Sequence, residues 1–297
     1  MFKSVGFTLI VVLLVSGISP AQVPEAKTAL DSFNIGLYYY NQGNKDTALQ
    51  LWKTMLENGN GKHTDIYGST YFNIPTIYWQ LGQKDSARIW YKRLLNSDLK
   101  DNDETGMLME PHTNYKHKSA VALAGLSQSD TNWMDVLHWL NQADTVYRYW
   151  GFEGSATSVS KRQSYLNTWK VAVYRKLHQD DQAIHELLIE LICASHLETF
   201  FSQSGDTLLS MVNHASFKTE LDDALNHATL EQVDSTHWVV RFKMNSLAYR
   251  IPYSSAYPSR DLPHYWRILF IKPGESPTIE KFIQDVHSRS FYLQLNQ

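Results

Sequence analysis

Cysteine is almost absent from this chain, and its scarcity excludes several kinds of site. Cys193 is the single cysteine among 297 residues, so no disulfide can form within the chain, and we expect no lipid-bearing cysteine of the lipoprotein type near the N-terminus. Cys193 and His196 share a helix turn, but two ligands do not make a metal site. No Asn-x-Ser/Thr acceptor occurs either, which favours a bacterial over a eukaryotic export route.

Long hydrophobic runs are also scarce. The run from Val5 to Val15 is shorter than the roughly 20 apolar residues that a membrane span needs. It follows Lys3 and precedes Ser19-Pro20-Ala21, which has small residues at the two positions that a signal peptidase reads. We therefore expect a signal peptide over residues 1–21, no transmembrane anchor, and a mature protein in the periplasm or outside a bacterium.

An excess of basic charge is missing as well. The net charge is −3, and no stripe of Lys and Arg is present to neutralise phosphates, so a nucleic-acid partner is not expected. Catalytic motifs are lacking too. Gly59-Asn60-Gly61 follows no strand, and Ile189 stands where a zinc-protease helix starting at His185-Glu186 needs its second histidine. These patterns predict no metal and no cofactor, and they assign no catalytic residue.

An internal repeat is the most informative feature that the sequence does contain. One pattern occurs twice with an offset of 39 residues: Phe33-Asn34-Ile35, Tyr39, Gly43, Lys45-Asp46 and Ala48 recur as Phe72-Asn73-Ile74, Tyr78, Gly82, Lys84-Asp85 and Ala87. Units of this length are supersecondary structures that bury their apolar faces by stacking on one another. The repeat therefore predicts an array of helical pairs.

The repeated residues resemble the tetratricopeptide repeats, whose pattern is Trp-x2-Leu-Gly-x2-Tyr, then Ala-x3-Phe, then Pro. The matching positions in the first copy are Ile35, Gly36, Tyr39, Ala48 and Trp52, and those in the second are Ile74, Tyr78, Ala87 and Tyr91. Pro75 replaces the glycine of the second copy and must either start that helix or kink it. A third copy contains Tyr174, Ala183 and Leu187, but its Lys170 and Val171 depart from the pattern.

The physical roles of the repeated residues can be stated without the family. Small side chains such as Gly36 and Ala87 allow two helices to approach closely. Gly43 and Gly82 suit a left-handed residue that ends the first helix of each pair. The aspartates near the start of the second helices, Asp46, Asp85 and Asp181, are expected to act as caps.

The remaining sequence predicts more helices and then a change of structure. The small-residue run Ser119 to Gly125, with Trp133, Leu137 and Leu140 after it, predicts a degenerate helical pair. Residues 151–160 are rich in Gly and Ser and are typical of a connection, and helices are expected at 187–192 and 208–225. The alternation from Trp238 to Met244 indicates a strand after a turn at Asp234-Ser235-Thr236, Tyr265 to Ile271 a second strand, and Thr278 to Val286 a short helix.

These observations together predict a mainly α protein. Its parts are the signal peptide, a tetratricopeptide-like helical domain over residues 26–227, and a small α+β unit over residues 228–297. The resemblance implies a right-handed repeat array, an α-solenoid. It also implies recognition of a protein or peptide in a concave groove, where the side chains of Asn34, Tyr38, Asn73 and Thr76 would project.

A polar patch offers a second candidate surface. The segment Glu110-Pro111-His112-Thr113-Asn114-Tyr115-Lys116-His117 is the densest group of hydrogen-bonding side chains in the sequence. It is either a polar helix start on the exposed rim of the array or a ligand-binding patch of Glu110, His112, Asn114, Tyr115 and His117.

Three functions are compatible with the sequence. We expect an exported, non-catalytic binding or assembly protein with a protein or peptide partner. The alternatives are a glycan or small-ligand binding protein that uses the surplus of aromatic residues, 9 Trp and 17 Tyr, and a hydrolase-type enzyme that uses Glu110, His112 and His117.

Overall fold

The computed structural model describes residues 28–59, 65–99, 114–149, 156–193, 202–254, 269–271 and 275–297. The expected signal peptide lies outside these residues. The chain divides into two compact units, Met1–Thr70 and Tyr71–Gln297, and each is described by itself.

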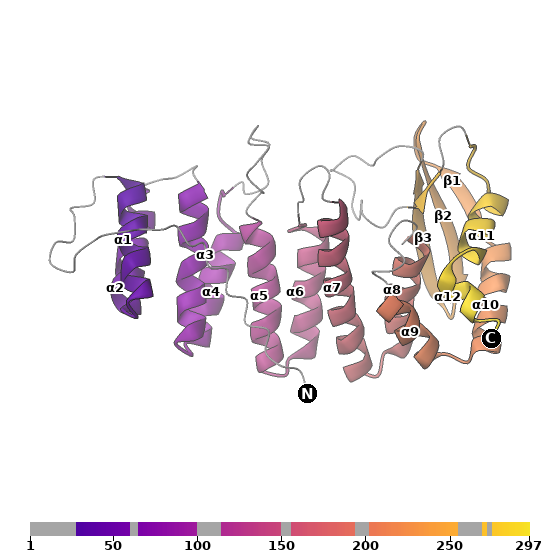
Figure 1. Ribbon diagram of the computed structural model, residues 1–297, viewed down its shortest axis with the longest axis horizontal. Coiled ribbons are helices and arrows are strands. Elements are labelled where there is room, and N and C mark those ends of the chain that lie inside the picture. Colours follow the sequence, from indigo (N-terminus) through magenta and orange to yellow (C-terminus); the bar gives the residue numbers. More distant parts are fainter. Residues whose placement is uncertain are drawn as a thin grey trace. The chain divides into compact units, whose positions relative to one another are not determined.

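Helices dominate the described residues, which confirms the predicted mainly helical class (Figure 1). They are α1 (Ala29–Asn41), α2 (Lys45–Glu57), α3 (Asp65–Gln80), α4 (Lys84–Leu95), α5 (Tyr115–Ser129), α6 (Trp133–Thr145), α7 (Ala156–Lys176), α8 (Asp180–Cys193), α9 (Ser202–Met211), α10 (His214–Asn226), α11 (Ile279–His287) and α12 (Ser290–Gln294). None of the helices in the described part of the chain is both long and apolar enough to cross a membrane.

The first eight helices form four pairs that share one turn. In each turn a residue with positive φ follows the first helix: Gly43 (82°), Gly82 (73°), Thr131 (56°) and His178 (57°). The next amide donates to a carbonyl five positions back, in the bonds Asn44 to Tyr39, Gln83 to Tyr78, Asn132 to Ser127 and Gln179 to Tyr174, at 2.9–3.0 Å. This is the hydrogen bond of a Schellman cap. The expected left-handed roles of Gly43 and Gly82 are confirmed, and the α5/α6 pair has the same turn without a glycine.

The shared turn aligns the four pairs, and equivalent positions have equivalent burial. Eight residues before the left-handed position stand Ile35, Ile74, Leu123 and Lys170, all buried. Four residues after the cap position stand Ala48, Ala87, Val136 and Ala183, each with 0% exposure. Lys170 therefore occupies a core position that is apolar in the other three pairs.

The first unit shows why one helix position must be small. A Cβ atom added to Gly36 of α1 would lie 2.1 Å from Nε1 of Trp52 in α2. That indole also donates to the carbonyl oxygen of Phe33 at 3.2 Å, so its place is fixed. The equivalent Pro75 lies within α3, not at its start.

The predicted caps need a correction. In α2 the capping oxygen comes from Asn44, which accepts from the amide of Thr47 at 3.3 Å, whereas Asp46 only stands in the first turn. Gln83 precedes α4 without a side-chain cap bond, and Asp85 instead contacts Arg88 at 3.4 Å. The Schellman turn places the residue after the glycine at the cap position, two residues earlier than the sequence suggested.

Two other predicted boundaries differ from the structure. Residues 156–160 were expected in a connection but form the first turns of α7, and the helical region 208–225 is divided between α9 and α10. Asn213 lies at the break, where its side chain accepts from the amide of Ser216 at 3.1 Å and starts α10.

The C-terminal part of the second unit contains a small sheet. Strands β1 (Thr229–Gln232), β2 (His237–Met244) and β3 (Leu247–Ser254) are antiparallel neighbours, and β4 (Leu269–Phe270) adds to β3 in parallel. The predicted turn into β2 is confirmed, because Asp234 accepts from the amides of Thr236 and His237 at 2.8 and 2.9 Å. The predicted helix after Thr278 is also confirmed as α11, with Thr278 as its cap.

The sheet shares one hydrophobic core with the last helices. Buried residues of this core include Leu188 of α8, Leu221 of α10, Val240 of β2, Ile251 of β3 and Phe282 of α11. In Figure 1 the sheet stands beside α8, with α10, α11 and α12 close to it. The apolar face of α8 is thus covered by sheet residues.

Candidate functional site

The predicted polar patch is only partly within the described residues. Glu110 and His112 lie outside them. Asn114 is buried immediately before α5, with a φ of 51°, and Tyr115 is half-buried, with its ring 5.8 Å from that of Phe72. The expectation of an exposed rim is therefore wrong for Asn114, since its side chain is covered by protein.

His117 departs furthest from the expectation, because it is 1% exposed. Its Nδ1 lies 3.1 Å from the carbonyl oxygen of Ala143 and 2.9 Å from that of Tyr147. Carbonyl oxygens only accept, so Nδ1 carries the proton. Its Nε2 then accepts from Nε of Arg162 at 2.9 Å. Both ring nitrogens are thus engaged within the protein.

The surroundings of His117 favour the neutral ring. Burial, and secondly the charge of Arg162, lower the pKa of His117 from 6.5 to about 3. A general acid or base works best when its pKa is near the operating pH. His117 is therefore unsuited to proton transfer at neutral pH, which removes one of the three residues on which the hydrolase alternative depended.

A buried ion pair lies next to this histidine. Lys170 of α7 contacts the carboxylate of Asp144 in α6, and their side chains are 2% and 1% exposed. Gln163 donates to the other carboxylate oxygen at 2.7 Å. Sequence analysis noted Lys170 only as a departure from the repeat. A lysine at a core position of a helical repeat was the available signal that a buried acid must face it.

The four residues expected to line a concave groove are all half-buried: Asn34, Tyr38, Asn73 and Thr76. Asn34 and Tyr38 belong to the first unit, and Asn73 and Thr76 to the second. The Thr76 hydroxyl lies 2.9 Å from the Phe72 carbonyl oxygen and 3.2 Å from the Tyr91 hydroxyl. Thr76 thus makes contacts within the α3/α4 pair.

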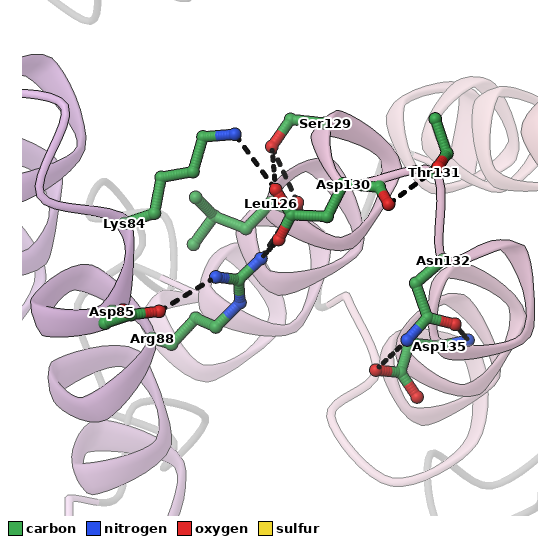
Figure 2. Close-up of polar contacts among 9 residues, drawn as sticks. All are labelled: Lys84, Asp85, Arg88, Leu126, Ser129, Asp130, Thr131, Asn132 and Asp135. Carbon is green, nitrogen blue, oxygen red and sulfur yellow. Dashed lines mark hydrogen bonds and ion pairs between the residues drawn. The ribbon is translucent and has the colours of Figure 1, made fainter.

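A charged cluster joins α4 to the turn between α5 and α6 (Figure 2). Asp130 accepts from Nζ of Lys84 at 2.9 Å and also from Arg88, and Arg88 donates to the Leu126 carbonyl oxygen at 3.1 Å. The hydrogen bond from Lys84 helps to lower the pKa of Asp130. These charges satisfy one another, so the cluster holds two pairs of helices together and offers little to a ligand.

An open groove of about 880 Å³ lies elsewhere in the second unit. Its lining comes from α6, the end of α7, the turn into α8, and the turn between β2 and β3: Met134, Leu137, His138, Asn141, Tyr174, His178, Gln179, Asp180, Asp181, Gln182, Asn245, Ser246 and Leu247. Two of its walls are tight turns with positive φ, at His178 and at Asn245-Ser246. Sequence analysis missed this groove because its walls are far apart in the chain.

The groove combines apolar and acidic surface. Met134 is 62% exposed, although it is apolar, and the half-buried ring of Tyr174 lies on the same lining. Asp180 and Asp181 are exposed in the first turn of α8. The arrangement suits an extended segment that has an apolar side chain and a positive charge.

Aromatic side chains of α3 and α7 form a second surface, on which Gly125 of α5 lies between them. A Cβ added to Gly125 of α5 would lie 3.0 Å from Trp79 and 3.9 Å from Trp169, and the ring of Tyr165 lies 5.9 Å from that of Trp169. Trp79 and Tyr165 are 39% and 47% exposed. We call Trp79, Trp169 and Tyr165 the aromatic strip.

Comparison with models of known protein families and with curated proteins gave no match to this chain. Among the described residues, no group of three or more His, Cys, Asp or Glu is placed to hold a metal ion. A function must therefore be argued from the groove and the aromatic strip.

Proposed function

We propose that the protein is a non-catalytic binding protein that recognises a peptide segment of a partner protein. The groove between α6, the α7–α8 turn and the β2–β3 turn carries this proposal. Its exposed Met134 lies on a lining with Leu137 and Tyr174. Exposed apolar surface with a polar rim is typical of interaction sites. The resemblance of the helical pairs to tetratricopeptide repeats points to the same class of partner.

The charge of the groove specifies the partner further. Among the described residues, its lining contains Asp180 and Asp181 but no lysine or arginine. We therefore expect a segment with a Lys or Arg next to a large apolar residue. Opposite charges across an exposed interface mainly raise the association rate and weaken with added salt.

Selection from a random peptide library displayed on phage, with the full mature chain as target, tests the proposal. Selected peptides should contain the basic and apolar pair. Met134→Asp should weaken their binding at least about tenfold, because it places a charge against the peptide's apolar residue. Asp180→Asn combined with Asp181→Asn should mainly slow association.

Ile89→Asp is the matched control, because Ile89 is also an exposed apolar residue, at 66%, and does not line the groove. Its peptide affinity should equal that of the wild type. If no peptide is selected, or if Met134→Asp binds the selected peptides as tightly as Ile89→Asp does, the proposal is wrong.

The aromatic strip supports a second candidate, the binding of a sugar. Exposed aromatic rings provide flat apolar surface, on which the C–H face of a pyranose can pack. Trp79→Ala and Tyr165→Ala should then abolish retention of the protein on a polysaccharide matrix that retains the wild type. If polysaccharide matrices retain neither the wild type nor the variants, this candidate is ruled out.

We also propose that the chain is exported from a bacterial cell. The support is Lys3, the apolar run after it, and Ser19-Pro20-Ala21. N-terminal sequencing of the protein from the periplasm or medium should begin at Gln22. Recovery with an intact Met1 would contradict export by this signal.

A further inference from the structure

Arg162 of α7 has a charge that no acid among the described residues balances. The residue is half-buried, its Nε donates to His117, and its guanidinium carbon lies 5.3 Å from the centre of the Tyr165 ring. Among the described residues, no carboxylate pairs with it and its two terminal amino groups have no hydrogen-bond partner. Burial lowers the pKa of Arg162, which reflects the cost of holding this charge away from water.

The neighbouring acid, Asp144, is already paired with other residues. Both carboxylate oxygens of Asp144 are engaged, one by Gln163 and one by Lys170. Asp144, in the last turn of α6, and Lys170 of α7 form a closed pair of opposite charges. Arg162 therefore contributes one excess positive charge to this region of the described structure.

His117 fixes the direction of the arginine. Since Nε is bound to Nε2 of His117, only the terminal amino groups of Arg162 are left to meet a ligand. Their hydrogens form a planar fork that matches the two oxygens of a carboxylate. The imidazole ring of His117 is held in turn by two backbone carbonyl oxygens. The guanidinium fork of Arg162 is therefore oriented before any ligand binds.

The aromatic strip begins beside this fork. Arg162 stacks on Tyr165, and Tyr165 contacts Trp169 edge to face. A ligand carboxylate at Arg162 would thus place the rest of the ligand near exposed aromatic surface. One cation favours a group with a single negative charge, since a phosphate dianion would remain half unbalanced.

We propose that Arg162 binds the carboxylate of a ligand whose ring-shaped body packs on Tyr165 and Trp169. The shared chemistry is a single carboxylate attached to a flat apolar face. A uronic acid and an aromatic acid both present it, and the experiment separates them. The site shares no residue with the peptide groove, so failure of one proposal does not affect the other.

Calorimetric titration of the full mature chain tests the proposal, with glucuronate and benzoate as probes and with glucose and benzamide as their uncharged counterparts. At least one acid should bind, and its uncharged counterpart should bind about 10- to 100-fold more weakly, because a charge-assisted hydrogen bond is lost. Glucuronate binding identifies a sugar acid and benzoate binding an aromatic acid.

Arg162→Gln should weaken binding of that acid by a similar factor. A matched control, Arg241→Gln, should keep the wild-type affinity, because Arg241 is already paired with Glu231 at 2.7 Å. In the wild type, the Nε–H resonance of Arg162 should shift on addition of the acid, a readout that needs no variant to fold.

The proposal is overturned if neither acid binds or if acid and uncharged counterpart bind equally. It is equally overturned if inorganic phosphate binds more tightly than both acids, or if the Arg162 resonance does not move while an acid binds.

Discussion

Nε of Arg162 donates a hydrogen bond to Nε2 of His117 across 2.9 Å, joining α7 to α5. The bond requires a neutral histidine, because a protonated ring has no lone pair to accept with. The tautomer is fixed by the two carbonyl oxygens at Nδ1. The packing of three helices thus depends on the protonation state of one buried ring.

Acid should therefore destabilise the fold through His117. Its pKa is 6.5 in an ordinary setting and about 3 here. As the pH falls through 6.5 the unfolded chain binds a proton at this ring and the folded chain does not, so the stability falls with pH. Between pH 6.5 and 3 the free energy of unfolding should lose about 1.4 kcal/mol per pH unit from this group.

Urea unfolding of the wild type and of His117→Gln at several pH values measures this effect. The variant will be less stable at pH 7, since it loses a buried hydrogen-bonded ring, but the gap between the two proteins should narrow as the pH falls from 6.5. A gap that stays constant down to pH 4 would show that His117 is protonated in the folded state.

The ion pair of Asp144 and Lys170 should be costly to break from one side. Asp144→Ala leaves the buried ammonium of Lys170 without its carboxylate and should lower the free energy of unfolding by about 3–5 kcal/mol. Lys170→Leu should recover part of this loss in the Asp144→Ala background, since Ile35, Ile74 and Leu123 fill the equivalent positions. Equal stability of the single and the double variant would contradict this account of the pair.

Gly36 and Gly205 should respond oppositely to the same substitution. Both lie in helices, where alanine is favoured over glycine by about 1 kcal/mol. Gly36→Ala places its Cβ 2.1 Å from the Trp52 indole and should destabilise the α1/α2 pair, whereas the new Cβ of Gly205→Ala meets only Leu191 at 3.9 Å and should stabilise. Thermal unfolding of both variants measures these changes in stability. If Gly36→Ala raised the unfolding temperature, Trp52 would not be held in place.

Ala87 gives a test of the repeat register. It is fully buried in α4, so Ala87→Phe overpacks its contact and should cost at least about 1–3 kcal/mol. Asp85→Ala, two residues earlier, should change stability little, because the Asp85 side chain is 98% exposed. If a denaturant series finds Ala87→Phe neutral, the helices do not meet at this position.

The repeated part of the fold could be predicted because local sequence determines it. Gly43 and Gly82 mark the turns by conformational freedom, and the alternation after Trp238 marks a strand. The α5/α6 turn could not be located in this way, since Thr131 adopts the left-handed conformation without being glycine. There the Asn132 cap and the Schellman hydrogen bonds stabilise the left-handed residue, which is a glycine in the first two pairs.

The candidate sites could not be predicted, because each joins residues that are far apart in the chain. His117 and Arg162 are separated by 45 residues, and the groove brings Met134 near Leu247. The polar segment ending at His117 suggested exposure by its composition, but burial follows from the helices packed over it. The charge of Lys170 at a core position of the repeat was the one sequence signal for a buried acid opposite it.

Hydrogen–deuterium exchange tests the central claim most directly, with the chain from Gln22 onwards alone and in complex with a library-selected peptide. The account predicts slower exchange in the two turns that form the groove walls, residues 178–182 and 245–247, with little change in α1 and α2. Protection confined to α1–α4, or none at the two turns while the peptide is bound, would contradict the proposal that this groove receives the partner.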